Sequence, residues 1–175
     1  MSVSLLVAYT KKGRVIGSDG KIPWNIPSER FRFKKLCNQK FIIMGRKSFD
    51  EIGHALSYCT IIIVSKSMKS APEGCMLAES FEKAMEIAKA STAAQASVAR
   101  ANEFTPAQEI LIAGGEEIYR QALPFADTIY ATEIHTEFAG NRFFPELDKS
   151  WHCTFTELHT DEQSKITYEY KTFEK

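Results

Sequence analysis

Phe41-Ile42-Ile43-Met44-Gly45-Arg46-Lys47-Ser48 joins a short apolar run to a basic turn led by glycine. An apolar, β-branched run of this length, bounded by a turn signal, is typical of a strand that is buried on both faces. Similar runs lie at 3–9, 60–64 and 110–113, and the last one ends before Gly114-Gly115. These four runs predict parallel strands inside a sheet.

Helical patterns alternate with these runs and occupy residues 28–37, 48–52, 80–90 and 116–123. After residue 126, apolar and polar side chains alternate as they do in antiparallel strands, at 128–134, 153–158 and 166–173. We therefore expect an α/β fold: a central mixed, mostly parallel sheet with an antiparallel C-terminal edge and helices on both faces.

The composition fits a globular protein, and we expect a single domain over residues 1–175. Its 22 basic and 22 acidic residues balance, so no global field favours nucleic acid or an anionic membrane. The apolar runs are too short for a signal peptide or a membrane span, which favours a cytoplasmic location. The four cysteines show no zinc-ligand spacing, so we expect reduced thiols and no metal site.

One segment, near residues 90–105, is rich in alanine and serine. We expect an insertion here, which either extends a helix or forms an excursion on the surface. Its side chains suggest no chemistry.

Three of the predicted strands end in residues suited to phosphate. In an open α/β sheet the ligand crevice lies at the carboxyl ends of the strands, where glycine allows close approach of the backbone. Gly45 and Gly114-Gly115 lie at two of these ends, and Arg46 and Lys66 add positive charge. Together they indicate a phosphate-rich ligand such as a dinucleotide, whereas each one alone is more commonly a turn or a solvated charge.

Neither familiar nucleotide signature is present. The chain has no G-x-G-x-x-G motif, and Gly45-Arg46-Lys47-Ser48 imitates only the end of a P-loop, because Arg46 stands where a glycine is required. Phosphoryl transfer is therefore disfavoured.

Glu29 follows a loop that is closed by two prolines, Pro23 and Pro27. At helical spacing, Glu29 shares one face with Phe33 and Leu36. A carboxylate on an apolar face needs a cationic or hydrogen-bonding partner, which a ligand can supply. The alternative is an acid that merely stabilises the start of a helix, by up to about 1 kcal/mol.

A set of motifs spread over nearly the whole chain resembles the dihydrofolate reductase family. After an early strand they are 14–17 (RVIG), 20–27 (GKIPWNIP), 43–49 (IMGRKSF), 112–119 (IAGGEEIY), 130–132 (YAT) and 140–145 (GNRFFP). The resemblance implies reduction of 7,8-dihydrofolate to tetrahydrofolate by NADPH, a step of one-carbon metabolism that antifolate inhibitors target. It also implies a monomer.

The resemblance assigns roles at the reacting end of the site. Glu29 matches the acid that receives the 2-amino group and N3 of the pterin. Thr132 is expected to contact its second oxygen, Trp24 to order a nearby water, and Ile22 to belong to a loop that closes over the nicotinamide. Because the carboxylate does not touch N5, water is the expected proton donor.

The resemblance implies two sets of contacts. For the substrate they are Leu6, Val7, Ala8, Glu29, Arg30, Phe33, Lys34, Ile52, Leu56, Ala113, Tyr119 and Thr132. For NADPH they are Ala8, Ile16, Gly17, Gly20, Lys21, Gly45, Arg46, Lys47, Ser48, Val64, Ser65, Lys66, Gly114, Gly115, Glu116, Glu117, Ile118 and Tyr119. Ser65 and Lys66 are expected to bind the 2′-phosphate and so to select NADPH over NADH. The Gly114–Gly115 peptide is expected to be cis. The apolar substrate residues have the alternative of being plain core.

Some positions depart from the family pattern. Cys59 stands where an arginine usually binds the α-carboxylate of the folate glutamate, a partner worth about 1.5–3 kcal/mol. Arg30 replaces a residue that is commonly aliphatic, and we expect Arg30 to take over the missing role, with Lys34 on the same side of the helix. The alternative is that Arg30 is a solvated arginine on a basic helix. Ala113 is smaller than usual and is expected to widen the pocket.

Cys59 keeps a second function open, that of an NADPH-dependent reductase of another pteridine or of a pyrimidine without the glutamate tail. A third possibility is a catalytically inactive nucleotide-binding relative. The presence of Glu29, Trp24, Thr132 and Gly114-Gly115 argues against this third reading.

Overall fold

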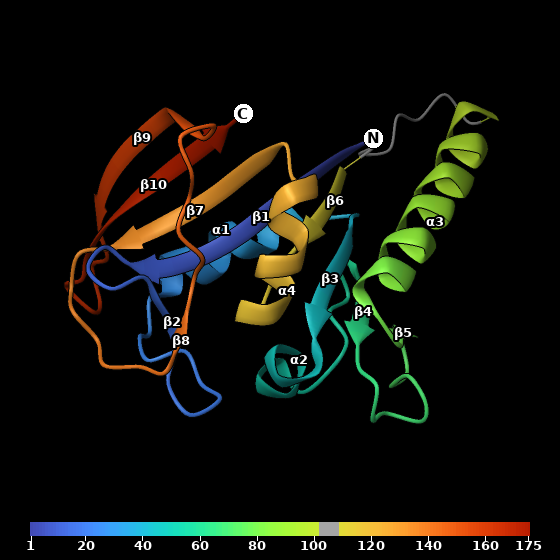
Figure 1. Ribbon diagram of the computed structural model, residues 1–175, viewed down its shortest axis with the longest axis horizontal. Coiled ribbons are helices and arrows are strands. Elements are labelled where there is room, and N and C mark those ends of the chain that lie inside the picture. The colour runs from blue at the N-terminus through green and yellow to red at the C-terminus, as the bar shows by residue number, and fades with distance from the viewer. Residues whose placement is uncertain (102–108) are drawn as a thin grey trace.

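The computed structural model describes residues 1–101 and 109–175. Within these residues, eight strands form one sheet in the order β5-β4-β3-β6-β1-β7-β10-β9 (Figure 1). The strands are β1 (Ser2–Thr10), β3 (Phe41–Gly45), β4 (Thr60–Val64), β5 (Cys75–Ala78), β6 (Glu109–Ile112), β7 (Thr128–Ile134), β9 (His152–Thr160) and β10 (Thr167–Glu174).

The strands from β5 to β7 pair in parallel, and β10 lies antiparallel between β7 and β9. Leu5, Ile42, Ile43 and Ile110 are fully buried in the parallel part. Strands that are covered on both faces carry apolar residues without alternation, which is why these segments form continuous apolar runs in the sequence. The predicted mixed sheet with an antiparallel C-terminal edge is confirmed.

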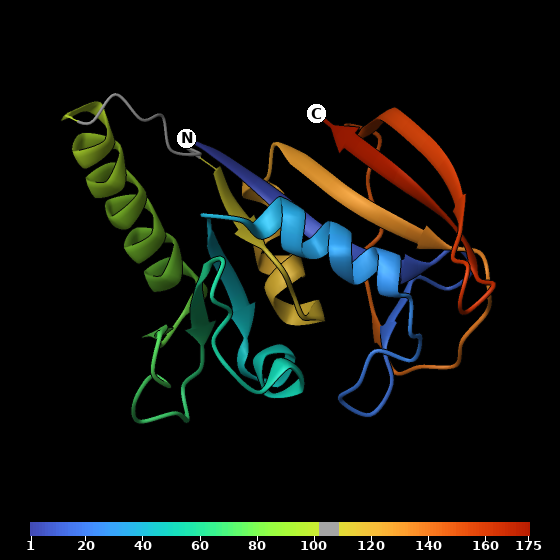
Figure 2. The same ribbon diagram turned by 180° about the vertical axis from the view of Figure 1, so that it is seen from behind.

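Helices cover both faces of the sheet. α1 (Pro27–Cys37) crosses one face, as Figure 2 shows, and α2 (Arg46–Ile52) contributes Phe49 to the buried cluster beneath α1. α3 (Phe81–Ala101) and α4 (Glu116–Ala122) pack on the other face, and a short 3-10 helix, η1 (Leu123–Phe125), follows α4.

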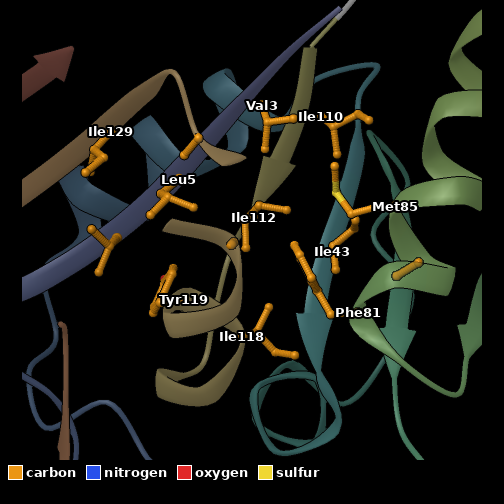
Figure 3. Packing of buried hydrophobic residues seen from close by; sticks show 14 of the residues in the cluster. Val3, Leu5, Ile43, Phe81, Met85, Ile110, Ile112, Ile118, Tyr119 and Ile129 are labelled. Atoms are coloured by element: carbon orange, nitrogen blue, oxygen red, sulfur yellow. The ribbon is translucent and has the colours of Figure 1, made fainter. Parts of the chain in front are cut away.

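Alternate residues of β1 divide the core into two clusters. Val3 and Leu5 point toward α3 and α4, where they join Ile112 and Tyr119 (Figure 3). Leu6 points the other way, into the cluster beneath α1. Each large apolar side chain buried in this way contributes about 1.5–3 kcal/mol to folding.

α3 is longer than the helix predicted at 80–90 and continues to Ala101. Of the two alternatives for the Ala/Ser-rich segment, the structure shows the helix extension up to Ala101. This agrees with the high helix propensity of alanine. The rest of that segment lies outside the described residues. Among the helices of the described chain, none has the length and hydropathy needed to cross a bilayer.

The sequence reading missed three short strands of the described chain. β2 (Val15–Gly17) pairs with β8 (Arg142–Phe143) in a separate two-stranded sheet, and β5 extends the main sheet beyond β4. α2 begins at Arg46, earlier than the predicted start at residue 48. Segments this short carry no periodic pattern, because tertiary pairing rather than local sequence determines them.

Candidate active site

Glu29 lies in the first turn of α1, which begins at Pro27 without a side-chain cap of its own. The backbone N–H and the hydroxyl of Ser28 donate to Oδ1 of Asp161 at 3.4 and 2.8 Å. Asp161 belongs to the turn between β9 and β10. It therefore caps α1 from a distant part of the chain and determines where Glu29 lies.

The carboxylate of Glu29 faces β7. Thr132 is fully buried, and its Oγ1 donates to Glu29 Oε1 at 3.4 Å. Burial raises the pKa of Glu29 above its ordinary value, while Arg32, the hydrogen bond from Thr132 and the charge of Arg30 oppose that rise. The carboxylate thus binds a proton more readily than an exposed glutamate does.

Arg32 also lies at this carboxylate and was not among the predicted site residues. Its Nη1 donates to Thr132 Oγ1 at 3.1 Å and to the carbonyl oxygen of Ala131 at 3.2 Å. Its guanidinium carbon lies 4.1 Å from the centre of the Tyr170 ring. The only signal in the sequence was the three-residue spacing from Glu29, which places both side chains on one side of a helix. We call Glu29, Arg32, Thr132 and Tyr170 the acid cluster.

Apolar side chains line the sheet beneath α1. Phe33, Ile52, Leu56 and Ala113 are partly buried and pack against the cluster that contains Leu6. These five residues were predicted to contact the substrate, and the structure brings them together on one face. α2 connects this wall to the strand ends, since Ile52 is the last residue of the helix.

Trp24 is buried beside the acid cluster. It packs in a group that includes Ala8 and Tyr170. Ala8 and Tyr170 are both in register with Thr132, one on each neighbouring strand. The indole is therefore held next to the strand positions that carry the Thr132 hydroxyl.

Val7 and Tyr119 lie on the opposite face of the sheet, in the cluster beneath α3 and α4. The Tyr119 hydroxyl donates to the carbonyl oxygen of Leu6 at 2.7 Å, and burial raises the pKa of this phenol. Tyr119 thus uses its hydroxyl within the protein. Because side chains alternate along a strand, Val7 presents only its backbone to the face that carries Glu29.

A cleft of about 1110 Å³ runs along the ends of β3, β4 and β2 and the starts of α2 and α4. Of the residues predicted to bind the cofactor, it is lined by Ile16, Gly17, Gly20, Lys21, Gly45, Arg46, Lys47, Ser48, Val64, Ser65, Lys66, Gly115, Glu116, Glu117 and Ile118. Among the described residues that were predicted with them, Ala8, Gly114 and Tyr119 do not line it.

The backbone of Gly45 and Gly115 lines one side of this cleft, and Gly114 lies next to both without lining it. The N–H of Gly45 donates to the carbonyl oxygen of Gly114 at 2.7 Å, and the Gly114–Gly115 peptide is cis. Gly114 has a φ of 102°, and a Cβ there would lie 3.0 Å from the Tyr119 ring. Only glycine fits this position without displacing its neighbours.

Charged side chains of both signs line the cleft, with as many acidic as basic residues. Lys21, Lys47 and Lys66 line it together with Arg46, whose Nη1 is paired with Asp50 at 2.8 Å. The sequence reading missed further lining residues, which include Asn141, Arg142, Ser80, Glu82, Arg120 and Gln121. Arg142 lies on β8, a strand too short to leave a pattern in the sequence.

The loop between β2 and α1 borders the cleft. Ile22 is 49% exposed, and its N–H donates to Glu51 Oε1 at 2.7 Å, which connects the loop to α2. Gly20 has a φ of 81°, and a Cβ there would meet no atom within 4 Å. The loop thus lies beside the cleft with its tip in open space.

Cys59 is partly buried and packs with Tyr58 against the Leu6 cluster. The ammonium of Lys34 lies 5.5 Å from the centre of the Tyr58 ring. Arg30 is exposed, and its Nη2 donates to Asn25 Oδ1 at 2.8 Å. α1 therefore presents Lys34, and not Arg30, to the segment that carries Cys59.

Glu133 on β7, His135 directly after β7 and Glu169 on β10 form a separate group of possible metal ligands. The ammonium of Lys171 lies 2.8 Å from Glu133 Oε1 and 3.2 Å from Glu169 Oε2. The ammonium of Lys11 lies 4.0 Å from Glu133 Oε1, so two lysines already pair with the two carboxylates and the group is an ion-pair network of the sheet.

The chain matches the family model described as dihydrofolate reductase over residues 2–175. The chain belongs to the dihydrofolate reductase family. It is 36% identical to the dihydrofolate reductase of Haemophilus influenzae over 167 residues, which cover 94% of this chain and 93% of the relative. Against the enzyme of Bacillus subtilis the identity is 34% over 164 residues, or 93% of this chain and 88% of the relative.

A solved dihydrofolate reductase, from Enterococcus faecalis and complexed with NADP(H) and RAB-propyl, has the same fold. The TM-score is 0.79 at 27% identity, and the match covers 99% of this chain and 95% of that one. The dihydrofolate reductase family, its fold class and its oxidoreductase activity, all expected from the sequence, are therefore confirmed.

Proposed function

We propose that the chain reduces 7,8-dihydrofolate to 5,6,7,8-tetrahydrofolate with NADPH, by adding a hydride at C6 and a proton at N5. The observation that carries the proposal is the Glu29 carboxylate, held by Thr132 on the same face as an apolar wall. α2 spans the two parts of the site, since Arg46 at its start lines the cleft and Ile52 at its end belongs to the wall.

The cleft fits a dinucleotide that carries a 2′-phosphate. Gly45 and Gly115 allow a phosphate to approach the backbone, and Lys47, Ser65 and Lys66 offer charge and hydrogen bonds. NADPH bound there supplies the hydride. We assign Ser65 and Lys66 to the 2′-phosphate, which makes them the residues that select NADPH over NADH.

Glu29 binds and orients the pterin. Its carboxylate accepts two parallel hydrogen bonds, from the 2-amino group and N3, while Thr132 donates to Oε1 and keeps the side chain in place. The raised pKa of Glu29 increases the proton affinity of the site, and a water beside it is the donor to N5. Phe33, Leu6 and Ile52 exclude bulk water from the rings of the substrate.

We assign the carboxylate of the folate tail to Lys34. Lys34 reaches over Tyr58, next to Cys59, whereas the guanidinium of Arg30 is paired with Asn25. Replacing Lys34 with methionine is expected to raise the KM for dihydrofolate about tenfold. Arg30→Leu is the matched variant, with a smaller expected effect, and an equal or larger effect of Arg30→Leu contradicts the assignment to Lys34.

We further propose that the enzyme acts as a cytoplasmic monomer on small molecules, including antifolate inhibitors. All four cysteines are free thiols, which suits a reducing compartment. Size-exclusion chromatography with light scattering tests the monomer, and a dimer mass in the micromolar range would contradict it.

The activity is tested by following the oxidation of NADPH with two substrates, 7,8-dihydrofolate and 7,8-dihydrobiopterin, which lacks the glutamate tail. We expect the larger kcat/KM with dihydrofolate. A preference for dihydrobiopterin supports the alternative that Cys59 raises, a pteridine reductase without tail recognition. No turnover of either compound, in protein that binds NADPH, indicates an inactive relative and overturns the proposal.

A further inference from the structure

Arg32 connects the acid cluster into one continuous network. Its Nη1 donates to Thr132 Oγ1 at 3.1 Å, and the same oxygen lies 3.4 Å from Glu29 Oε1. A guanidinium has donors only. The hydroxyl of Thr132 therefore accepts from Arg32 and has its own hydrogen free to donate to Glu29.

β10 supports the guanidinium of Arg32 through Tyr170. It stacks over the ring of Tyr170, whose hydroxyl donates to Tyr168 Oη at 3.5 Å. Tyr168 Oη lies 2.7 Å from Ser28 Oγ, and Ser28 donates to Asp161. An arginine clamped between a stacked ring and two oxygen acceptors loses little further freedom when a substrate binds.

Among the described residues, groups on four elements interact with Glu29 through charge or hydrogen bonding. They are Arg30, Arg32 and Cys37 on α1, Thr132 on β7, Tyr119 on α4 and Tyr170 on β10. Burial raises the pKa of Cys37, Tyr119 and Tyr170, so these three remain neutral near pH 7. The charge next to Glu29 comes from the two arginines, and Arg32 acts more strongly than Arg30.

We propose that Arg32 is a positioning residue for the reduction: clamped on Tyr170, it keeps the Thr132 hydroxyl donating to Glu29 and places a permanent positive charge beside that carboxylate. This inference rests on the proposed function of Glu29 as the partner of the pterin. The charge of Arg32 favours the ionised form of this largely buried carboxylate, which is the form that accepts both pterin hydrogen bonds.

A direct test measures the titration of Glu29 by NMR. In protein with carbon-13 in its glutamate carboxyl groups, Glu29→Gln identifies the resonance of Glu29. We expect its midpoint to move to higher pH in Arg32→Met and to return toward the parent value in Arg32→Lys. Lys35→Met removes a charge from an exposed position of the same helix and is expected to leave the midpoint unchanged.

Kinetics give the second readout. In Arg32→Met the KM for dihydrofolate is expected to rise several-fold in mildly acidic buffer and to approach the parent value in alkaline buffer, where Glu29 is ionised without help. A structural defect would instead raise KM equally at every pH. If Arg32→Met does not fold, Arg32→Gln retains a donor to Thr132 without the charge and is measured in its place.

An unchanged midpoint in a folded Arg32→Met protein overturns the inference, even if the enzyme reduces dihydrofolate. Conversely, the absence of any turnover in the parent protein overturns the proposed function while the NMR titration still measures the effect of Arg32. The two failures are therefore distinguishable.

Discussion

The cleft and the acid cluster are built in different ways. The cleft consists largely of backbone and short segments at strand ends, such as Gly45 to Ser48 and Ser65 with Lys66, and it is open and lined by charged side chains of both signs. The acid cluster consists of side chains from α1, β7 and β10, with Glu29 and Thr132 more than 100 residues apart in the sequence.

This difference should separate the binding of NADPH in the cleft from the binding and reduction of dihydrofolate at the acid cluster. A cleft made of backbone tolerates changes in side chains that do not touch a phosphate, because its shape depends on a few glycines. A cluster made of interlocking side chains loses its geometry with any member. Substitutions in the two regions should therefore have separable effects on NADPH and on dihydrofolate.

The largest effect is expected from Glu29→Gln. The amide retains the size of the side chain but loses the charge that receives the pterin, so kcat/KM for dihydrofolate should fall about 10²–10³-fold. NADPH affinity, measured by fluorescence titration, should change by less than about twofold. A comparable loss of NADPH affinity would show that the two regions are not independent.

Gly114→Ala should damage the cleft instead. A methyl group there meets the Tyr119 ring at 3.0 Å, and the φ of 102° is unfavourable for alanine. We expect the Kd for NADPH to rise about tenfold or more, because displacing Gly114 also moves Gly45 and Gly115, which line the cleft. Gly13→Ala is the control, because Gly13 has a φ of 82° and a Cβ there makes no close contact. It should lower the free energy of unfolding by about 1 kcal/mol without changing the Kd for NADPH.

Lys66→Met should change how well the cleft distinguishes NADPH from NADH. Loss of a charge-assisted contact to the 2′-phosphate is expected to raise the KM for NADPH about tenfold and to leave the KM for NADH nearly unchanged. Lys69, an exposed lysine outside the cleft, provides the matched substitution to methionine. Equal losses with both cofactors would place Lys66 away from the 2′-phosphate.

The smallest effect is expected from Asp161→Asn, which should lower the thermal stability of the protein. Hydrogen bonds from Ser164 and Ser28 hold the pKa of Asp161 well below its usual range in the folded protein. A depressed pKa adds stability above the unfolded value, and this stability is lost as the pH falls through the folded value. The variant should melt a few degrees lower at neutral pH, and the difference should shrink in acid. Thermal melts of the parent and the variant over a pH series measure this difference in melting temperature. A difference that stays constant with pH would show that the lost stability does not come from the ionisation of Asp161.

The cleft could be predicted from the sequence because its residues come in short local motifs. Gly45 to Ser48 and Gly115 to Ile118 are contiguous, and their positions near strand ends follow from the apolar runs before them. Arg142 could not be found in this way, since β8 exists only through its pairing with β2.

The acid cluster could be predicted only in part. Glu29 was found from its place on an apolar helix face, and Thr132 only through the family resemblance. Arg32 was not identified from the sequence. Its role depends on Tyr170 and Ala131, which only the pairing of β7 with β10 brings beneath α1.

The pairing of β10 with β7 also bears on when the enzyme becomes active during its synthesis. A ribosome makes Glu29 early, but Tyr168 and Tyr170, which secure its helix and its arginine, emerge after all the strands of the parallel sheet. A nascent chain halted before β10 would hold the cleft residues and the acid without the clamp around it. Reduction would thus be coupled to completion of the C-terminal hairpin.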